Sequence, residues 1–161
     1  MPHIIPQDDI PTPFTLSLRY NFYMADFHFY HPIEVRYGDL DPQGHVNNAK
    51  YLTYFEQARI SYVIHLGLWD GLSFLDVGII LAEAQVTFRA PVLFAQKIQV
   101  GVGVTRLGNK SLTMEYCLED AHTRQELAVG STVLVAYDYR TGLTIPLPAD
   151  WRETISQFEG L

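Results

Sequence analysis

The chain has little cysteine and no long apolar run. Its single cysteine, Cys117, excludes an internal disulfide and a cysteine-rich zinc site, and it is typical of a reducing compartment. No apolar run approaches the 18 residues that indicate a membrane-spanning helix. The N-terminus carries prolines and two aspartates in place of a basic stretch followed by an apolar one, so no export signal is indicated. We therefore expect a cytoplasmic protein.

Basic residues are also scarce. Eleven Lys and Arg stand against 18 Asp and Glu, which gives a net charge of −7. Because nucleic acids are bound through basic surfaces, this balance argues against a nucleic-acid partner and favours a small molecule. The histidines at 28, 31, 65 and 122 are scattered without the spacing of metal ligands, so no metal site is predicted. Aromatic residues make up 13% of the chain, which suits a well-filled core and an apolar pocket.

The order of apolar patterns predicts one α+β domain. Residues 1–26 contain four prolines and are expected to form a partly irregular N-terminal arm, while residues 27–161 form a single domain. A strand is predicted first, with Pro32 implying an edge position or a bulge. A long helix follows, because apolar residues recur at steps of three and four. Four strands then come before a short C-terminal helix, and short turns between the last three predict an antiparallel meander. The expected ranges are 27–37 for the first strand, 48–66 for the helix, 78–88, 96–107, 111–119 and 126–139 for the later strands, and 149–158 for the last helix.

One run, Gly38–Leu52, holds two carboxylates, a turn, an imidazole and an Asn pair. Pro42 and Gly44 predict a tight turn, because proline fixes φ and glycine admits positive φ. Asn47 and Asn48 are favourable N-cap types, and the helical pattern follows them. The chain therefore leaves a strand, turns sharply and opens a helix, whose first amides suit an anion or a developing oxyanion.

This motif resembles that of a known family. The residues that carry the resemblance are Asp39-Leu40-Asp41-Pro42-Gln43-Gly44-His45-Val46-Asn47-Asn48, then Tyr51 and Phe55-Glu56-Gln57-Ala58-Arg59. Together they resemble the hotdog-fold acyl-CoA thioesterases of the 4-hydroxybenzoyl-CoA thioesterase-like family, over about residues 27–147. The resemblance implies an α+β hotdog fold, in which a curved antiparallel β-sheet wraps a long central helix. It also implies a homodimer or homotetramer with sites at the dimer interface, and no cofactor, since coenzyme A is part of the substrate.

The resemblance assigns the catalytic roles to Asp41, Asn48 and His45. Asp41 attacks the thioester directly or deprotonates a water, and the backbone N–H of Asn48 polarises the carbonyl. A thiolate leaves without strong acid help, so one carboxylate and one helix end suffice. His45 has a supporting role, and Asp39 is expected only to support the loop by hydrogen bonds. The alternatives are structural: Asp41 caps the turn, and His45 caps the helix or bonds a neighbouring backbone group.

Six further residues are predicted to bind substrate, namely Gln43, Asn47, Glu56, Arg89, Arg106 and Lys110. Gln43 stands where the related acyl-carrier-protein thioesterases have an Asn, and it can donate to a water or a carbonyl. Asn47 is also a capping residue, and Glu56 can instead pair with Arg59, three positions on. The turn around Lys110 resembles the family's basic hairpin that meets the nucleotide phosphates, with a solvated hairpin tip as the alternative.

The leading interpretation is an acyl-CoA thioesterase that hydrolyses a fatty or aromatic acyl thioester to the free acid and CoA. Two alternatives stay open. One is a hotdog hydratase or dehydratase, which also pairs Asp with His, and the other is a non-catalytic module that binds acyl-CoA. The sequence does not distinguish CoA from acyl-carrier protein as the thiol carrier. No nucleic-acid or membrane partner is expected.

Overall fold

A computed structural model of the chain describes residues 27–69, 73 and 78–161. The predicted N-terminal arm lies outside these residues. The elements in chain order are β1 (Tyr30–Ile33), the 3-10 turn η2 (Tyr37–Asp39), α1 (Asn48–His65), β2 (Ile79–Phe88), β3 (Ile98–Leu107), β4 (Ser111–Asp120), β5 (Glu126–Asp138), β6 (Leu143–Thr144) and α2 (Ala149–Glu159). Their order confirms the predicted sequence of strand, helix, four strands and helix, with β6 as a short addition.

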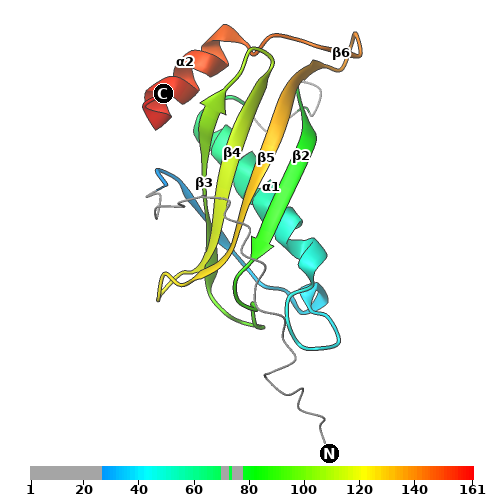
Figure 1. Ribbon diagram of the computed structural model, residues 1–161, viewed down its shortest axis with the longest axis vertical. Helices are drawn as coiled ribbons and strands as arrows, with labels where there is room; N and C mark the ends of the chain where they lie inside the picture. The colour runs from blue at the N-terminus through cyan, green and yellow to red at the C-terminus, as the bar shows by residue number, and fades with distance from the viewer. Residues whose placement is uncertain (1–26, 70–72, 74–77) are drawn as a thin grey trace, which may run out of the picture.

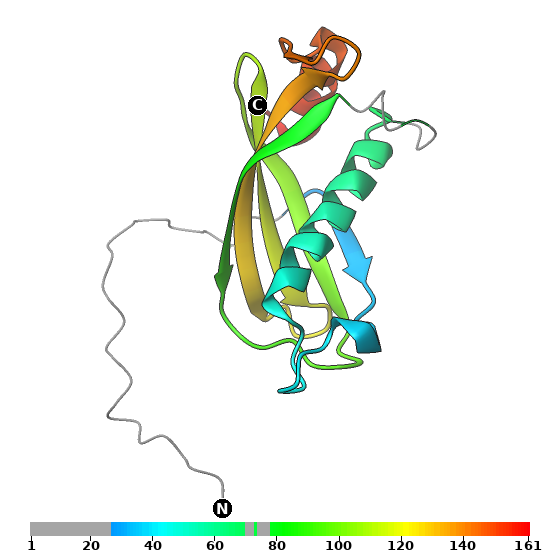
Figure 2. The same cartoon turned by 90° about the vertical axis from the view of Figure 1, so that its right-hand side faces the viewer.

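The strands form one antiparallel sheet in the order β1-β3-β4-β5-β2, with β6 paired to β5. Neighbours β3, β4 and β5 make the predicted meander, and β1 and β2 are the two ends of the main sheet. Figure 1 shows the sheet in front of α1, and Figure 2 shows the helix lying along one curved face. The hotdog architecture is therefore confirmed. Pro32 lies in β1, an edge strand, as its missing N–H requires.

Helix α1 forms where the sequence provides a cap and an apolar face. The side-chain oxygen of Asn47 accepts a hydrogen bond from the Ala49 N–H at 2.9 Å, which satisfies one of the unpaired amides of the first turn. The face that meets the sheet is fully buried, and Phe55 stacks on Tyr116 of β4 with ring centroids 4.7 Å apart. The helix ends before Gly67, whose φ of 70° is the left-handed conformation common after a helix C-terminus.

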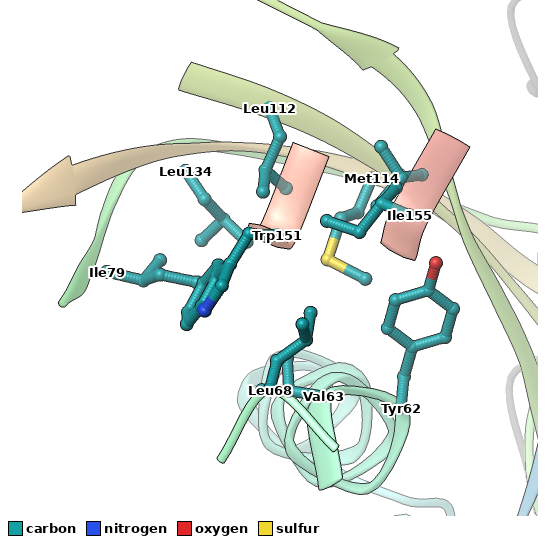
Figure 3. A pocket seen from close by; sticks show the side chains of 10 residues that line it. Tyr62, Val63, Leu68, Ile79, Leu112, Met114, Leu134, Trp151 and Ile155 are labelled. Carbon is teal, nitrogen blue, oxygen red and sulfur yellow. The ribbon is translucent and has the colours of Figure 1, made fainter. Parts of the chain in front are cut away.

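The core is closed at the C-terminal end of α1 by α2. Trp151 and Ile155 of α2 are buried, and together with α1 and the sheet they surround a small cavity of about 10 Å³, shown in Figure 3. Its other lining side chains are Tyr62, Val63, Leu68, Ile79, Val104, Leu112, Met114 and Leu134. The Tyr62 hydroxyl donates to Glu159 of α2 at 2.6 Å, so the lining presents almost nothing polar to a ligand. We interpret this cavity as a packing defect of the core.

The first strand is shorter than expected, and the strand after α1 has a partner that the sequence did not indicate. The first strand covers only Tyr30–Ile33 of the expected 27–37, because the chain turns into η2 and the Asp39 carboxylate accepts a hydrogen bond from the Arg36 N–H. The strand after α1 pairs with the last long strand, β5, and a nine-residue connection leads from β2 to β3. No helix among the described residues is long and apolar enough to cross a membrane.

Candidate active site

The loop between η2 and α1 is a closed reversal of the chain. Leu40 and Val46 face each other in an isolated antiparallel bridge. Inside it, the Asp41 N–H donates to the His45 carbonyl at 2.8 Å, and the Gly44 N–H donates to the Asp41 carbonyl at 3.0 Å. Gly44 has φ of 82°, a conformation in which a side chain is strained. The turn that the sequence predicts from Pro42 and Gly44 is thus confirmed, and it fixes the backbone on both sides of Asp41.

The Asp41 carboxylate is oriented by backbone amides. Its Oδ1 accepts hydrogen bonds from the Gln43 N–H at 2.8 Å and the His45 N–H at 3.3 Å. Within residues 27–69, 73 and 78–161, no side chain or amide donates to its Oδ2. The side chain is only partly buried. One oxygen of this carboxylate is therefore held in place, and the other is available to a ligand or a water.

The Asp41 loop forms one side of the site, and the connection that follows β2 forms a second side. The Val46 N–H donates to the Val92 carbonyl at 2.9 Å, and His45 forms an isolated bridge with Leu93. Helix α1 begins between the Asp41 loop and this connection. In the described part of the chain no group accepts the N–H of Asn48, the first helical residue, as is usual for the first turn of a helix. The free amide, the positive end of the helix dipole and the Asp41 loop thus lie at the same end of the molecule.

These elements enclose a cavity of about 320 Å³ that is open to solvent on one side. It is lined by Asp41, Gln43, His45, Val46, Asn48, Tyr51, Phe88, Arg89, Ala90 and Pro91. The structure therefore brings together all three residues predicted as catalytic, along with two of those predicted to bind substrate, Gln43 and Arg89.

The cavity has one apolar side and one charged side. Tyr51 of α1 is buried and meets the ring of Phe88 edge to face at a centroid distance of 4.9 Å. Burial raises the pKa of the Tyr51 hydroxyl, so this group stays neutral. On the charged side, the Nε of Arg89 lies 3.3 Å from a carboxylate oxygen of Glu126, and both side chains are roughly half exposed. Arg89 supplies the positive charge of the lining, opposite in sign to Asp41.

Four residues predicted to bind substrate lie outside this lining, namely Asn47, Glu56, Arg106 and Lys110. Asn47 caps α1, as its residue type predicts. Glu56 is exposed on α1, and its carboxylate oxygen lies 3.4 Å from Arg59, which is the alternative pairing. Lys110 donates to the carbonyl and hydroxyl of Thr144 at 3.0 and 3.2 Å.

The hairpin that carries Lys110 lies at the far end of the sheet from the cavity. The Ala136 N–H donates to the Lys110 carbonyl, and Ala136 pairs with Ile79 at the start of β2. Phe88, at the cavity, is the last residue of the same ten-residue strand, about 30 Å away. Arg106 is exposed next to this hairpin. Within a single chain, Arg106 and Lys110 are therefore too far from Asp41 to contact the same substrate group.

Five lining residues were not among the predicted site residues: Val46, Tyr51, Phe88, Ala90 and Pro91. The approach of the last three depends on the pairing of β2 with β5 and on the hydrogen bond between Val46 and Val92, neither of which has a local signal. Cys117 lies on β4, where burial and nearby carboxylates raise the pKa of its thiol to about 12. A neutral thiol is a poor nucleophile. No group of three or more His, Cys, Asp or Glu side chains suited to a metal ion occurs within the described ranges.

Asp41 and the start of α1 line one cavity of this hotdog fold, an arrangement suited to thioester chemistry. Residues 35–155 match the thioesterase-like superfamily. The chain belongs to this family, and it is a thioester hydrolase.

Individual relatives agree with this placement. A solved structure of a thioesterase complexed with coenzyme A and Zn from Thermus thermophilus is similar, with a TM-score of 0.75, 36% identity, and coverage of 86% of this chain and 99% of the other. The long-chain acyl-CoA thioesterase FadM of Escherichia coli is 25% identical over 134 residues, which are 78% of this chain and 95% of FadM. The uncharacterized protein YsmA of Bacillus subtilis is 24% identical over 143 residues, which are 89% of this chain and 95% of YsmA.

Proposed function

We propose that this protein hydrolyses acyl-CoA thioesters to a free acid and CoA, with Asp41 as base or nucleophile and the N-terminus of α1 as the oxyanion site. The observation that carries the proposal is the cavity in which Asp41 and the start of α1 meet. Two similar proteins support the substrate class, since one is named a long-chain acyl-CoA thioesterase and the other was solved with coenzyme A. The scheme uses no cofactor, because coenzyme A is part of the substrate.

Asp41 has two balanced routes to the products. As a nucleophile, its free oxygen bonds to the thioester carbon, the C–S bond breaks, and the CoA thiolate leaves a mixed anhydride that water then hydrolyses. As a base, it takes a proton from a water whose oxygen attacks the same carbon, and the tetrahedral intermediate expels the thiolate. In both routes negative charge develops on the carbonyl oxygen, and the Asn48 N–H is the donor available to stabilise it.

His45 and Gln43 take supporting roles in this proposal. Both line the cavity, and both donate backbone N–H groups to Asp41 Oδ1. Their side chains are then left to contact the attacking water or the substrate. Of the Lys and Arg residues that the structure describes, Arg89 lines the cavity and is therefore the proposed contact for a phosphate of coenzyme A. Glu126 neutralises Arg89 until the phosphate takes its place.

The apolar side of the cavity is proposed to receive the acyl group. Tyr51 and Phe88 present aromatic rings, and Val46 and Pro91 add aliphatic surface. Such a lining accepts an aliphatic or an aromatic acyl group by burial of apolar surface. The long-chain acyl-CoA relative favours the aliphatic class.

A homodimer or homotetramer is proposed to complete the site. β2 is an end strand of ten residues, and an unpaired edge of that length favours pairing with another strand. If two copies pair antiparallel along β2, the Ile79 end of one strand lies beside the Phe88 end of the other. The basic hairpin of the second copy, with its Arg106 and Lys110, would then lie at the same end as the first copy's cavity. Sedimentation at micromolar concentration should give a mass of two or four chains.

The function is tested by following thiol release from a panel of short, long and aromatic acyl-CoAs and from an acyl-carrier-protein thioester. We expect release from at least one CoA thioester, and a loss of about 100-fold or more in turnover for Asp41→Asn. Glu153→Gln, at an exposed carboxylate on α2, which packs against β3, is the control and should be fully active.

Other outcomes point to the two alternative functions. Hydration of a crotonyl thioester without thiol release would indicate a hydratase. If CoA binds but Asp41→Asn releases thiol as fast as the wild type, the catalytic assignment is wrong. If no thioester is cleaved while acyl-CoA binds, a non-catalytic binding module is the better description. The cytoplasm stays the predicted compartment.

A further inference from the structure

Asp39 is a buried carboxylate two residues before Asp41, with a role that the proposed reaction does not use directly. It is only 1% exposed and therefore out of reach of a substrate. Its Oδ2 accepts hydrogen bonds from the Arg36 N–H and from the Tyr54 hydroxyl, each at 3.0 Å. The guanidinium of Arg36 donates to both of its oxygens at 3.3 Å, and the Lys50 ammonium lies 3.5 Å from Oδ1. This is a far denser set of partners than a turn requires.

The partners of Asp39 come from each segment that positions the site. Arg36 precedes the loop, while Tyr54 lies about two turns inside α1 and is fully buried. The backbone carbonyl of Asp39 also accepts the N–H of Asn47, the cap of α1, at 2.8 Å. Asp39 therefore joins the beginning of the Asp41 loop, its end and the body of the helix. In the sequence the carboxylate and its helix partner Tyr54 are 15 residues apart, so this contact forms only when the loop and α1 are packed together.

From this geometry we propose that Asp39 is a positioning residue, which fixes the Asp41 carboxylate relative to the first amide of α1. This inference rests on the proposed function for its consequence in catalysis, but not for its structural content. An attacking oxygen and an oxyanion donor contribute only when both are held within a fraction of an ångström of the reacting carbonyl. Loosening the joint at Asp39 should therefore lower kcat much more than it weakens substrate binding.

The charge of Asp39 gives a second and independent signature. Burial opposes its ionisation, but the hydrogen bonds from Arg36 and Tyr54 outweigh burial and hold the pKa of the Asp39 carboxyl below its ordinary value. The folded protein thus keeps a negative charge beside Asp41, balanced by Arg36 and Lys50.

Removing that charge leaves Arg36 and Lys50 unbalanced near the site. The loss of a nearby negative charge and the unbalanced positive charges both favour the ionised form of Asp41. The acid limb of the pH–kcat profile should therefore move to lower pH. Among the described residues, the other charged or titratable groups of the cavity lining are His45, Arg89 and Tyr51, with Glu126 paired to Arg89, and the substitution leaves these residues unchanged. A loss of packing alone would not move this limb in a defined direction.

Asp39→Asn and Tyr54→Phe separate position from charge. Asp39→Asn keeps the side-chain shape but removes the charge and one acceptor, and kcat should fall about 100-fold with KM changed less than about threefold. Tyr54→Phe removes one hydrogen bond and keeps the charge, so kcat should fall about 10-fold with no shift of the acid limb. Glu153→Gln, at the exposed α2 carboxylate used above, should leave kcat, KM and the limb unchanged.

A readout other than activity keeps the inference testable on its own. Hydrogen exchange of the Gln43, His45 and Asn47 amides reports the loop directly, since all three are hydrogen-bonded within it. Both variants should speed their exchange by about 10-fold or more while the amides of β3–β5 keep their protection. If Asp39→Asn does not fold, Tyr54→Phe alone gives the answer.

The outcomes distinguish this inference from the proposed function. Wild-type kcat in a folded Asp39→Asn or Tyr54→Phe variant, or unchanged loop exchange, would overturn the positioning role while leaving the thioesterase proposal intact. A wild-type protein that cleaves no thioester would overturn the proposed function, and loop exchange would still decide the role of Asp39.

Discussion

Asp41 and His45 exchange two hydrogen bonds, and neither uses the imidazole. The Asp41 N–H donates to the His45 carbonyl at 2.8 Å, and the His45 N–H returns to Asp41 Oδ1 at 3.3 Å. The carboxylate is thus oriented by the backbone of the turn, in which residue 45 participates whatever its side chain. This separates two contributions of His45, one from its backbone and one from its ring.

His45→Ala is therefore expected to be a mild variant. It keeps both backbone bonds to Asp41 and removes only the ring from the cavity lining, so we expect kcat to fall less than about 10-fold. Steady-state thiol release with the best substrate of the panel measures this, with Asp41→Asn as the severe reference. A loss near that of Asp41→Asn would show instead that the imidazole takes part in proton transfer.

Gly44→Ala should destabilise the protein through the backbone alone. Gly44 has φ of 82°, yet an added Cβ would meet nothing within 4 Å, so steric contact contributes nothing. The left-handed conformation costs a non-glycine residue about 1–2 kcal/mol, and the free energy of unfolding should fall by that amount. Urea denaturation measures the change. Gly38→Ala is the matched control, because its surroundings are equally open and its φ is not positive, and equal losses in the two variants would contradict the explanation.

Sequence reasoning reached the fold because local signals and the motif agree. The alternation Ile98, Val100, Val102 and Val104 predicts one buried face of a strand, and all four side chains are at most 3% exposed. The Asn47 cap was likewise readable from residue type and from the helical pattern after it. These features depend on neighbours in the chain, and short-range rules are sufficient for them.

Only part of the candidate site could be predicted by the same reasoning. Asp41, His45 and Asn48 are close in the sequence, so one motif predicts them together. Phe88 joins them only because β2 pairs with β5, and no local pattern specifies that pairing. Arg89 was predicted from its charge and not from its position. Asp39 was predicted to support the loop, but its burial depends on Tyr54 of the packed helix and therefore needs the folded structure.

Gly130→Ala should destabilise the core by overpacking. An added Cβ would lie 2.5 Å from a ring carbon of Phe55 and 2.7 Å from the Gln85 carbonyl oxygen, so α1 or β2 must move. Such strain typically costs about 1–3 kcal/mol. Denaturant unfolding measures the loss, and adding Phe55→Leu should recover part of it by removing the first contact. If the two substitutions are simply additive, the ring of Phe55 is not the cause.

Cys117 should make the protein less stable at high pH. Burial, with the charges of Glu126 and Glu119, raises the pKa of its thiol to about 12 from an ordinary value near 9.0. Between these pH values the unfolded chain releases the thiol proton and the folded chain keeps it. Because the folded state then binds more protons, the free energy of unfolding contributed by this group is present below pH 9 and is lost as pH rises toward 12. Other groups also titrate in this range, so the comparison must be with Cys117→Ser, which has no such group. Urea midpoints from about pH 8 to about pH 11 should converge or cross in favour of the serine variant as pH rises, and parallel curves for the two proteins would contradict a buried neutral thiol.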